Sequence, residues 1–180
     1  GAGRSVVVAG PTQPAAVHAM CIAINSALGN IGSTVSYREM SVDEAMGLSA
    51  LASLVSSMKA GKVDTLVTIG ANPVYDAPGS MDFAGAFAKV PNRLTASVGN
   101  NETIEASTWR LPLAHDLESW SDSEAIDGTM APIQPMIAPL FGGMSDLEVL
   151  LIAAGVPQTD GYEFVRGVWK NRLGDGFEKK

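Results

Sequence analysis

Short β-branched runs alternate with helical patterns along the chain as far as about residue 110. The runs cover residues 5–9 (SVVVA), 34–37, 65–69 (TLVTI) and 93–98, with residues 109–111 as a possible fifth. Strands that alternate with helices in this way build a parallel sheet with right-handed crossovers and helices on both faces. The sequence therefore predicts an α/β fold with a mostly parallel sheet.

Capping residues mark the ends of the expected helices. Pro14 opens a helical stretch that stops at Gly29, and residues 83–89 form a second, short helical pattern. Three pairs have the spacing of a capping box or resemble one, and each precedes a helical pattern. These pairs are Ser41 with Glu44, Ser145 with Glu148, and Asp160 with Glu163.

The pattern changes over residues 111–143, where several prolines and a group of acids replace regular periods. We expect a long, loop-rich segment there. We also expect one α/β domain over residues 1–173, which would be part of a larger protein, and a polar tail over residues 174–180.

Composition excludes several classes of function. Hydrophobic residues make up 46% of the chain and charged residues 17%, so the chain should fold compactly. A formal charge of -7 without a basic patch argues against a nucleic-acid partner. No apolar run reaches the roughly 18 residues that a membrane span needs, so we expect a soluble chain without direct membrane insertion. The single cysteine, Cys21, cannot hold an iron–sulfur cluster by itself.

The sequence Gly70-Ala71-Asn72-Pro73 follows directly after one of the expected strands. Open α/β sheets bind ligands at the carboxyl ends of their strands, so this turn is either a ligand loop or a structural hinge. The glycine patterns that cradle nucleotide phosphates, GxGxxG and GxxxxGK[ST], do not occur in the expected places.

An acidic cluster within residues 115–127 is the other place where a site could be assembled. It contains His115, Asp116, Glu118, Asp122, Glu124 and Asp127. It lacks the spacing of known zinc or calcium motifs, which favours solvated or structurally bonded groups. A free-standing metal-dependent hydrolase is the function this cluster would serve if it held a metal; we assign no metal ligands and no catalytic residues.

Several separated segments, in this order, resemble the molybdopterin oxidoreductase superfamily. The segment 23–32 is similar to that family's helix and its Leu-x-Gly-Asn-x-Gly turn, and Thr65 to Pro73 to its strand before Gly-x-Asn-Pro. The succession of Leu111-Pro112, Glu118, Asp127-Gly128-Thr129 and Gln134 resembles the family's later motifs.

A closer resemblance is to one branch, the large iron–sulfur subunit of bacterial alternative complex III. It covers residues 5–170 and rests on short strings spread along the chain. These are Val8-Ala9-Gly10, Gln13-Pro14, Val17-His18, Asn72 to Pro78, His115 with Leu117 to Trp120, Gln134-Pro135, Ile137 to Leu140, Ser145, and Val165 to Trp169.

This resemblance implies a Rossmann-like domain that serves as a non-catalytic scaffold in a quinol-oxidising respiratory subunit. It implies no cofactor in this chain, with iron–sulfur clusters elsewhere in the parent protein. The implied partners are other domains of that subunit and other subunits of a membrane-associated complex, at the periplasmic face of the bacterial inner membrane.

An alternative reading is a domain of an active molybdenum oxidoreductase that binds molybdopterin guanine dinucleotide. Either reading gives the chain an edge that faces the pterin, as a remnant or as a working site. Its expected residues are Gly70, Asn72, Pro73, Asp76, His115, Glu118, Asp127, Gly128 and Thr129.

Overall fold

The computed structural model describes residues 2–37, 47–125 and 127–179, and divides the chain into two compact units. The first unit is Gly1–Val42 and the second is Asp43–Lys180. The single domain expected over residues 1–173 is therefore described in two parts. The capping box of Ser41 and Glu44 lies outside the described residues.

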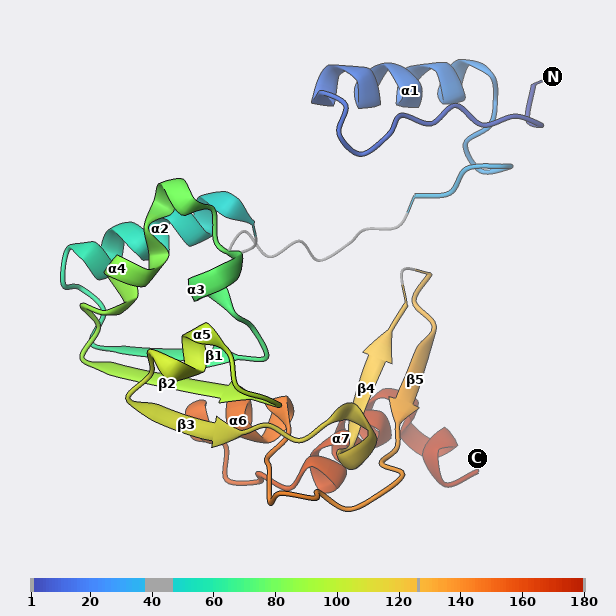
Figure 1. The fold of residues 1–180 in the computed structure, drawn as a ribbon. Helices are drawn as coiled ribbons and strands as arrows, with labels where there is room; N and C mark the ends of the chain where they lie inside the picture. The colour runs from blue at the N-terminus through green and yellow to red at the C-terminus, as the bar shows by residue number, and fades with distance from the viewer. Residues whose placement is uncertain (1, 38–46, 126, 180) are drawn as a thin grey trace. The chain divides into compact units, whose positions relative to one another are not determined.

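The first unit contains one helix, α1 (Ala15–Ala27), within its described part (Figure 1). Pro14 stands at its N-cap, where its fixed φ suits the entry into a helix and its missing N–H costs nothing. Gly29 ends the helix with a φ of 63°, which a residue with a Cβ would rarely adopt. The sequence prediction for this helix is confirmed.

The prediction of a strand over residues 5–9 is wrong, because this segment joins no β-ladder. It is held instead by a side chain of α1. Val7 N donates to Asn25 Oδ1 at 3.0 Å, and Asn25 Nδ2 donates to Val7 O at 2.7 Å. The amide of Asn25 thus pairs with one peptide unit of the segment, as a neighbouring strand would.

The strand expected over residues 34–37 is also wrong. Asn30 O accepts hydrogen bonds from the backbone N–H groups of Ser33, Thr34 and Val35, which folds the chain into a tight turn. Only an isolated bridge between Ile31 and Val35 remains. Backbone N–H groups that would form hydrogen bonds with a neighbouring strand form them within this local turn instead.

The centre of the first unit is polar. The Asn25 and Asn30 side chains are buried, and Asn30 Nδ2 donates to Asn25 Oδ1 at 3.0 Å. Several apolar side chains of the unit are exposed instead; they include Val6, Val8, Met20, Ile22 and Ile24.

The second unit is built on a three-stranded parallel sheet in the order β1-β2-β3 (Figure 1). The strands are β1 (Thr65–Ile69), β2 (Asn92–Ser97) and β3 (Trp109–Pro112). Val67 pairs with Leu94, and Leu94 pairs with Trp109. The parallel sheet and the α/β class are confirmed.

Short helices connect the strands. α2 (Leu48–Lys59) precedes β1. The β1–β2 connection contains α3 (Pro73–Asp76), the 3₁₀ turn η1 (Gly79–Met81) and α4 (Phe83–Phe87), and the β2–β3 connection contains α5 (Glu102–Glu105).

A hydrophobic core lies between α2 and α4. On α2, apolar side chains recur at helical spacing and face the core, among them Val55 and Met58. From α4, the Phe83 and Phe87 rings stack with centroids 5.8 Å apart. Each large side chain buried there stabilises the fold by roughly 1.5–3 kcal/mol.

The segment 111–143, where we expected a loop-rich region, also contains an antiparallel hairpin of β4 (Ser121–Glu124) and β5 (Met130–Ile133) after the 3₁₀ turn η2 (Asp116–Glu118). Two features explain why the sequence did not predict the hairpin. The four residues of β4 are all polar, so they show no alternation, and β5 contains Pro132, which weakens a strand prediction.

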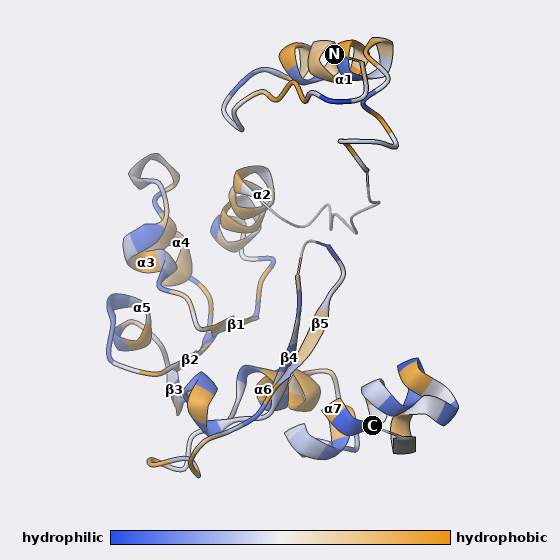
Figure 2. Cartoon of the chain, turned by 90° about the vertical axis from the view of Figure 1, so that its right-hand side faces the viewer, coloured by the Kyte–Doolittle hydropathy of each residue, from blue (hydrophilic) through white to orange (hydrophobic). Residues whose placement is uncertain are grey.

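The late helices are α6 (Asp146–Ala153) and α7 (Gly161–Leu173), and η3 (Gly174–Lys179) follows them. The expected capping box of α6 is confirmed, because Glu148 N donates to Ser145 Oγ and Ser145 N donates to Glu148 Oε2. Helix α6 is largely apolar (Figure 2), yet Leu150 and Ile152 are exposed. Within the described residues, no helix combines the length and hydropathy needed to cross a bilayer.

Candidate functional site

A cavity of about 450 Å³ lies at the carboxyl ends of the parallel strands. This is the place where open α/β sheets bind their ligands. Its walls come from the ends of β1 and β3, the start of η2 and the first residue of α6. They are Ile69, Gly70, Val98, Leu113, Ala114, His115, Asp116, Ser119 and Asp146.

Gly70 turns the chain away from the sheet at the end of β1. Its φ of 62° lies in the left-handed region, which favours glycine. Its N–H still donates to Ala96 O of β2, so the turn begins directly after the last sheet hydrogen bond. A Cβ at Gly70 would find only ordinary contact, with Leu113 Cδ2 at 3.9 Å, so it is the backbone conformation that requires glycine.

His115 stands at the N-cap of η2, where its ring is oriented by the backbone. His115 Nδ1 accepts a hydrogen bond from Leu117 N at 3.2 Å. A neutral imidazole whose Nδ1 accepts carries its proton on Nε2. His115 therefore presents Nε2–H as a donor.

The charged walls of the cavity are acidic. Asp116 and Asp146 both line it, and the described residues that line it include no lysine or arginine. Asp146 is partly engaged, because its Oδ1 accepts a hydrogen bond from Leu147 N at 2.8 Å. Two carboxylates without a cation disfavour a phosphate group at this place.

Asn72 is not a wall of this cavity; its side chain joins the β1–α3 turn to α5. Asn72 Oδ1 accepts from Thr103 N at 3.1 Å and from Thr103 Oγ1 at 2.8 Å, and Asn72 Nδ2 donates to Glu102 Oε2 at 2.7 Å. The hydrogen bond from Asn72 holds the pKa of Glu102 below its usual value. Next to Asn72, Pro73 opens α3, and Asp76, the last residue of α3, is exposed.

Glu118 has a structural position as well. Its Oε2 accepts from His115 N at 3.1 Å, and its Oε1 accepts from Leu140 N at 3.3 Å. Glu118 therefore closes the cap of η2 and fastens the long loop after β5 to it.

Asp127, Gly128 and Thr129 form the turn of the β4–β5 hairpin. Asp127 Oδ1 accepts from Thr129 N at 2.8 Å, and this hydrogen bond lowers the pKa of Asp127. Gly128 has a φ of 85°, as the turn requires. None of the three residues lines the cavity at the strand ends. Of the nine expected edge residues, only Gly70 and His115 do.

The rest of the acidic cluster is dispersed. Trp169 Nε1 donates to Asp122 Oδ2 at 3.0 Å, and Glu124 forms an ion pair with Arg172 at 3.7 Å. In the part of the chain that the structure describes, no three His, Cys, Asp or Glu side chains are grouped so that they could hold a metal ion.

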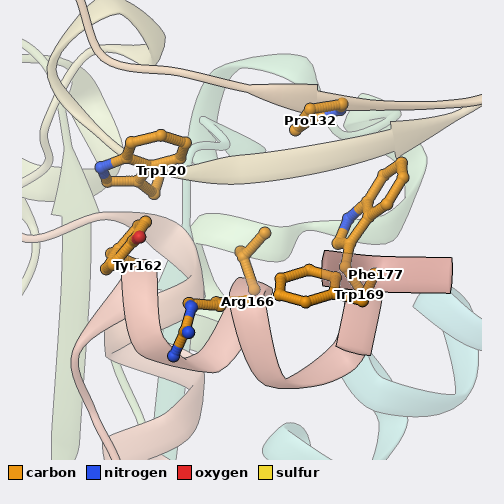
Figure 3. Close-up of a pocket in the computed structure, with 7 residues that line it drawn as sticks. Trp120, Pro132, Tyr162, Arg166, Trp169 and Phe177 are labelled. Atoms are coloured by element: carbon orange, nitrogen blue, oxygen red, sulfur yellow. The ribbon is translucent and has the colours of Figure 1, made fainter. Parts of the chain in front are cut away.

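A second cavity, of about 210 Å³, was not predicted as a site (Figure 3). It lies between α7, the β4–β5 hairpin and η3. Its walls are Trp120, Pro132, Tyr162, Val165, Arg166, Trp169 and Phe177. Tyr162, Val165 and Trp169 recur at helical spacing along α7 and lie on one face of it. The sequence did not show that Trp120 and Phe177 face them.

Comparison with known proteins adds no assignment. No family model matches the chain, and no curated protein sequence matches it.

Proposed function

We propose that the chain is a non-catalytic scaffold domain, resembling a molybdopterin oxidoreductase, in a quinol-oxidising respiratory electron-transfer subunit. In this proposal the parallel sheet is the core of a Rossmann-like domain, and its role is assembly and positioning. The family follows from the sequence resemblance. The structural support concerns the choice between a scaffold and a cofactor-binding domain.

The choice of a scaffold rests on one observation: three of the polar side chains expected to face a pterin, those of Asn72, Glu118 and Asp127, are engaged in hydrogen bonds within the chain. The Asn72 amide bonds to Thr103 and Glu102, Glu118 bonds to His115 and Leu140, and Asp127 bonds to Thr129. A ligand that recruited them would have to break these hydrogen bonds, and a ligand bond that only replaces them adds little net affinity.

The charge of the cavity at the strand ends also favours the scaffold. Molybdopterin guanine dinucleotide carries phosphates, and Asp116 and Asp146 would repel them. These two carboxylates disfavour the dinucleotide at this edge, and we assign no residue to it.

Exposed apolar surface is consistent with partners in a larger assembly. In the loop after β5, Met136, Leu140 and Phe141 are exposed, and on α6 so are Leu150 and Ile152. Soluble monomers rarely expose large contiguous apolar patches, so these surfaces suit contact with other domains or subunits. We place that assembly at the periplasmic face of the bacterial inner membrane, on the resemblance alone.

A second candidate is a pterin-dinucleotide-binding domain of an active molybdenum oxidoreductase. The observation in its favour is the cavity itself, which lies at the carboxyl ends of the strands and brings Gly70 and His115 together.

The experiment that separates the two is elemental and fluorescence analysis of the complete parent protein purified from its native host. The scaffold proposal expects no stoichiometric molybdenum and no oxidised pterin, together with cytochrome-containing subunits that copurify in detergent. A known molybdenum enzyme processed in parallel is the control for cofactor loss. Stoichiometric pterin would overturn the scaffold in favour of the second candidate, and a parent protein without respiratory partners would contradict it too.

A further inference from the structure

The aromatic cavity beside α7 has no part in the proposed function. Figure 3 shows Trp120 and Tyr162 on one side of it and Trp169 and Phe177 on the other, with Pro132 above. Val165, which is buried, also lines the cavity. The cavity is thus a slot between two pairs of rings.

The side chains that form the walls of the slot are held in place by contacts with one another and with Asp122. The Trp120 and Tyr162 rings lie 4.9 Å apart with an interplanar angle of 56°, a favourable tilted arrangement. On the other side, the hydrogen bond from Trp169 Nε1 to Asp122 Oδ2 fixes the indole and satisfies its only donor. A ligand would therefore meet the faces and edges of rings that are already ordered.

The size of the slot suits a single ring with a short substituent. A cavity of roughly 150 Å³ lined by apolar side chains is large enough to bind benzene. The volume here is about 210 Å³, which leaves room for a few more atoms.

Arg166 gives the slot its charge, because among the described residues that line it Arg166 alone is charged. Its guanidinium lies 5.8 Å from the centroid of the Phe177 ring, and its Nη1 lies 3.7 Å from Glu163 Oε2. Both side chains of this ion pair are about half exposed, with exposed fractions of 42% and 49%. Such a pair is weak, so the guanidinium can accept another carboxylate.

We propose that this cavity binds a small aromatic carboxylate. The ring occupies the slot between the two pairs of aromatic side chains, and the carboxylate accepts hydrogen bonds from the Arg166 guanidinium at its rim. A carboxylate fits the planar fork of arginine better than other anions of this size. A cationic ligand is disfavoured because Arg166 would repel it.

The test uses phenylacetate as the probe, with phenylacetamide as its neutral analogue and acetate as the probe without a ring. Binding to the whole chain is measured by titration calorimetry and by NMR of the three tryptophan indole N–H groups. We expect phenylacetate to saturate with a Kd of about 0.1–1 mM, as befits a ligand of this size, and acetate not to bind. The Trp120 and Trp169 signals should shift. The Trp109 signal should not, because Trp109 lies on β3, outside the cavity.

Arg166→Gln is the variant that tests the carboxylate contact. It should weaken phenylacetate binding roughly tenfold and leave phenylacetamide binding unchanged. Lys170→Gln is the matched control, because Lys170 is an exposed cation on the same helix and does not line the cavity. Its affinity for phenylacetate should equal that of the unmodified chain.

Three results would overturn the proposal. The first is the absence of saturable phenylacetate binding, and the second is binding that shifts Trp109 as much as Trp120 and Trp169. The third is equal affinity for phenylacetate and phenylacetamide, which would show that the slot recognises the ring alone. Because Arg166 is exposed, Arg166→Gln should fold, and the NMR spectrum verifies this directly.

Discussion

The indole of Trp169 donates a 3.0 Å hydrogen bond to Asp122 Oδ2, although 47 positions of the chain separate the two residues. This bond joins α7 to the β4–β5 hairpin. Together with the ion pair between Glu124 and Arg172, it connects α7 to the hairpin, whose strands are only four residues long.

Replacement of Asp122 with alanine should lower the free energy of unfolding by about 1–2 kcal/mol, because the partly buried indole N–H loses its acceptor. Asp122→Asn should restore most of the loss, since its amide oxygen can still accept. Urea unfolding followed by circular dichroism measures both. Ser123→Ala, an exposed change on the same strand, is the control. Equal stability of Asp122→Ala and Ser123→Ala would show that the bond contributes nothing.

Asn25 should be essential to the first unit. Its amide makes two hydrogen bonds to Val7 and receives one from Asn30, so Asn25→Ala should destabilise this unit by about 2–3 kcal/mol. Amide hydrogen exchange at Val7 should accelerate accordingly. Ser26→Ala, an exposed change on the same helix, should leave that exchange rate unchanged. An unaltered rate in Asn25→Ala would refute the role of the amide.

The ionisation of Glu102 should depend on Asn72, whose hydrogen bond lowers the pKa of this carboxyl. A carboxyl with a depressed pKa in the folded state stabilises the fold above its unfolded pKa, and this contribution is lost as the pH falls through the folded pKa. Because Glu102 is exposed, solvent screens the contribution of its carboxylate to stability. The pKa of Glu102, measured by NMR titration, is therefore a more sensitive test than the free energy of unfolding. In Asn72→Ala, the NMR titration midpoint of Glu102 should rise towards the usual value. Asn100→Ala, an exposed change nearby, should leave it unchanged.

Gly143 should not tolerate a side chain. A Cβ there would lie 2.9 Å from Ala114 N and 3.0 Å from Leu113 C, which are backbone atoms that cannot move aside. Gly143→Ala should therefore lower the free energy of unfolding by about 1–3 kcal/mol. It should also disturb the bridge between Leu113 and Met144 beside the cavity at the strand ends. Gly99→Ala, which meets nothing within 4 Å, is the comparison, and equal thermal melting of the two variants would contradict the steric argument.

The elements that the sequence predicted well are those whose signals are local. The pattern of residues 65–69, the capping box of Ser145 and Glu148, and Pro14 with Gly29 each specify a boundary through their own backbone chemistry. The strand at residues 5–9 failed because strand formation depends on a partner that a β-branched run cannot supply. In this protein the side-chain amide of Asn25, and not a neighbouring strand, forms hydrogen bonds with this segment.

The sequence could predict where the candidate site lies, but not which side chains form it. Gly70 and the end of β1 follow from the parallel sheet, whose ligand crevice lies at the carboxyl ends of the strands. The acidic cluster around His115 could not be assigned from sequence, because side chains that are close in the chain point to different partners. Asp122 meets Trp169, and Asp127 closes its own turn. The aromatic slot required contacts between α7, the hairpin and Phe177 of η3, where only a polar tail was expected.

The spatial order of the parallel strands is also their order along the chain. Each strand pairs with the one made just before it, across connections that contain only short helical turns. The entropy of closing such short loops is small, so the pairing depends little on distant segments. During synthesis, the sheet can therefore grow at one edge as β2 and then β3 leave the ribosome, without waiting for α6 or α7.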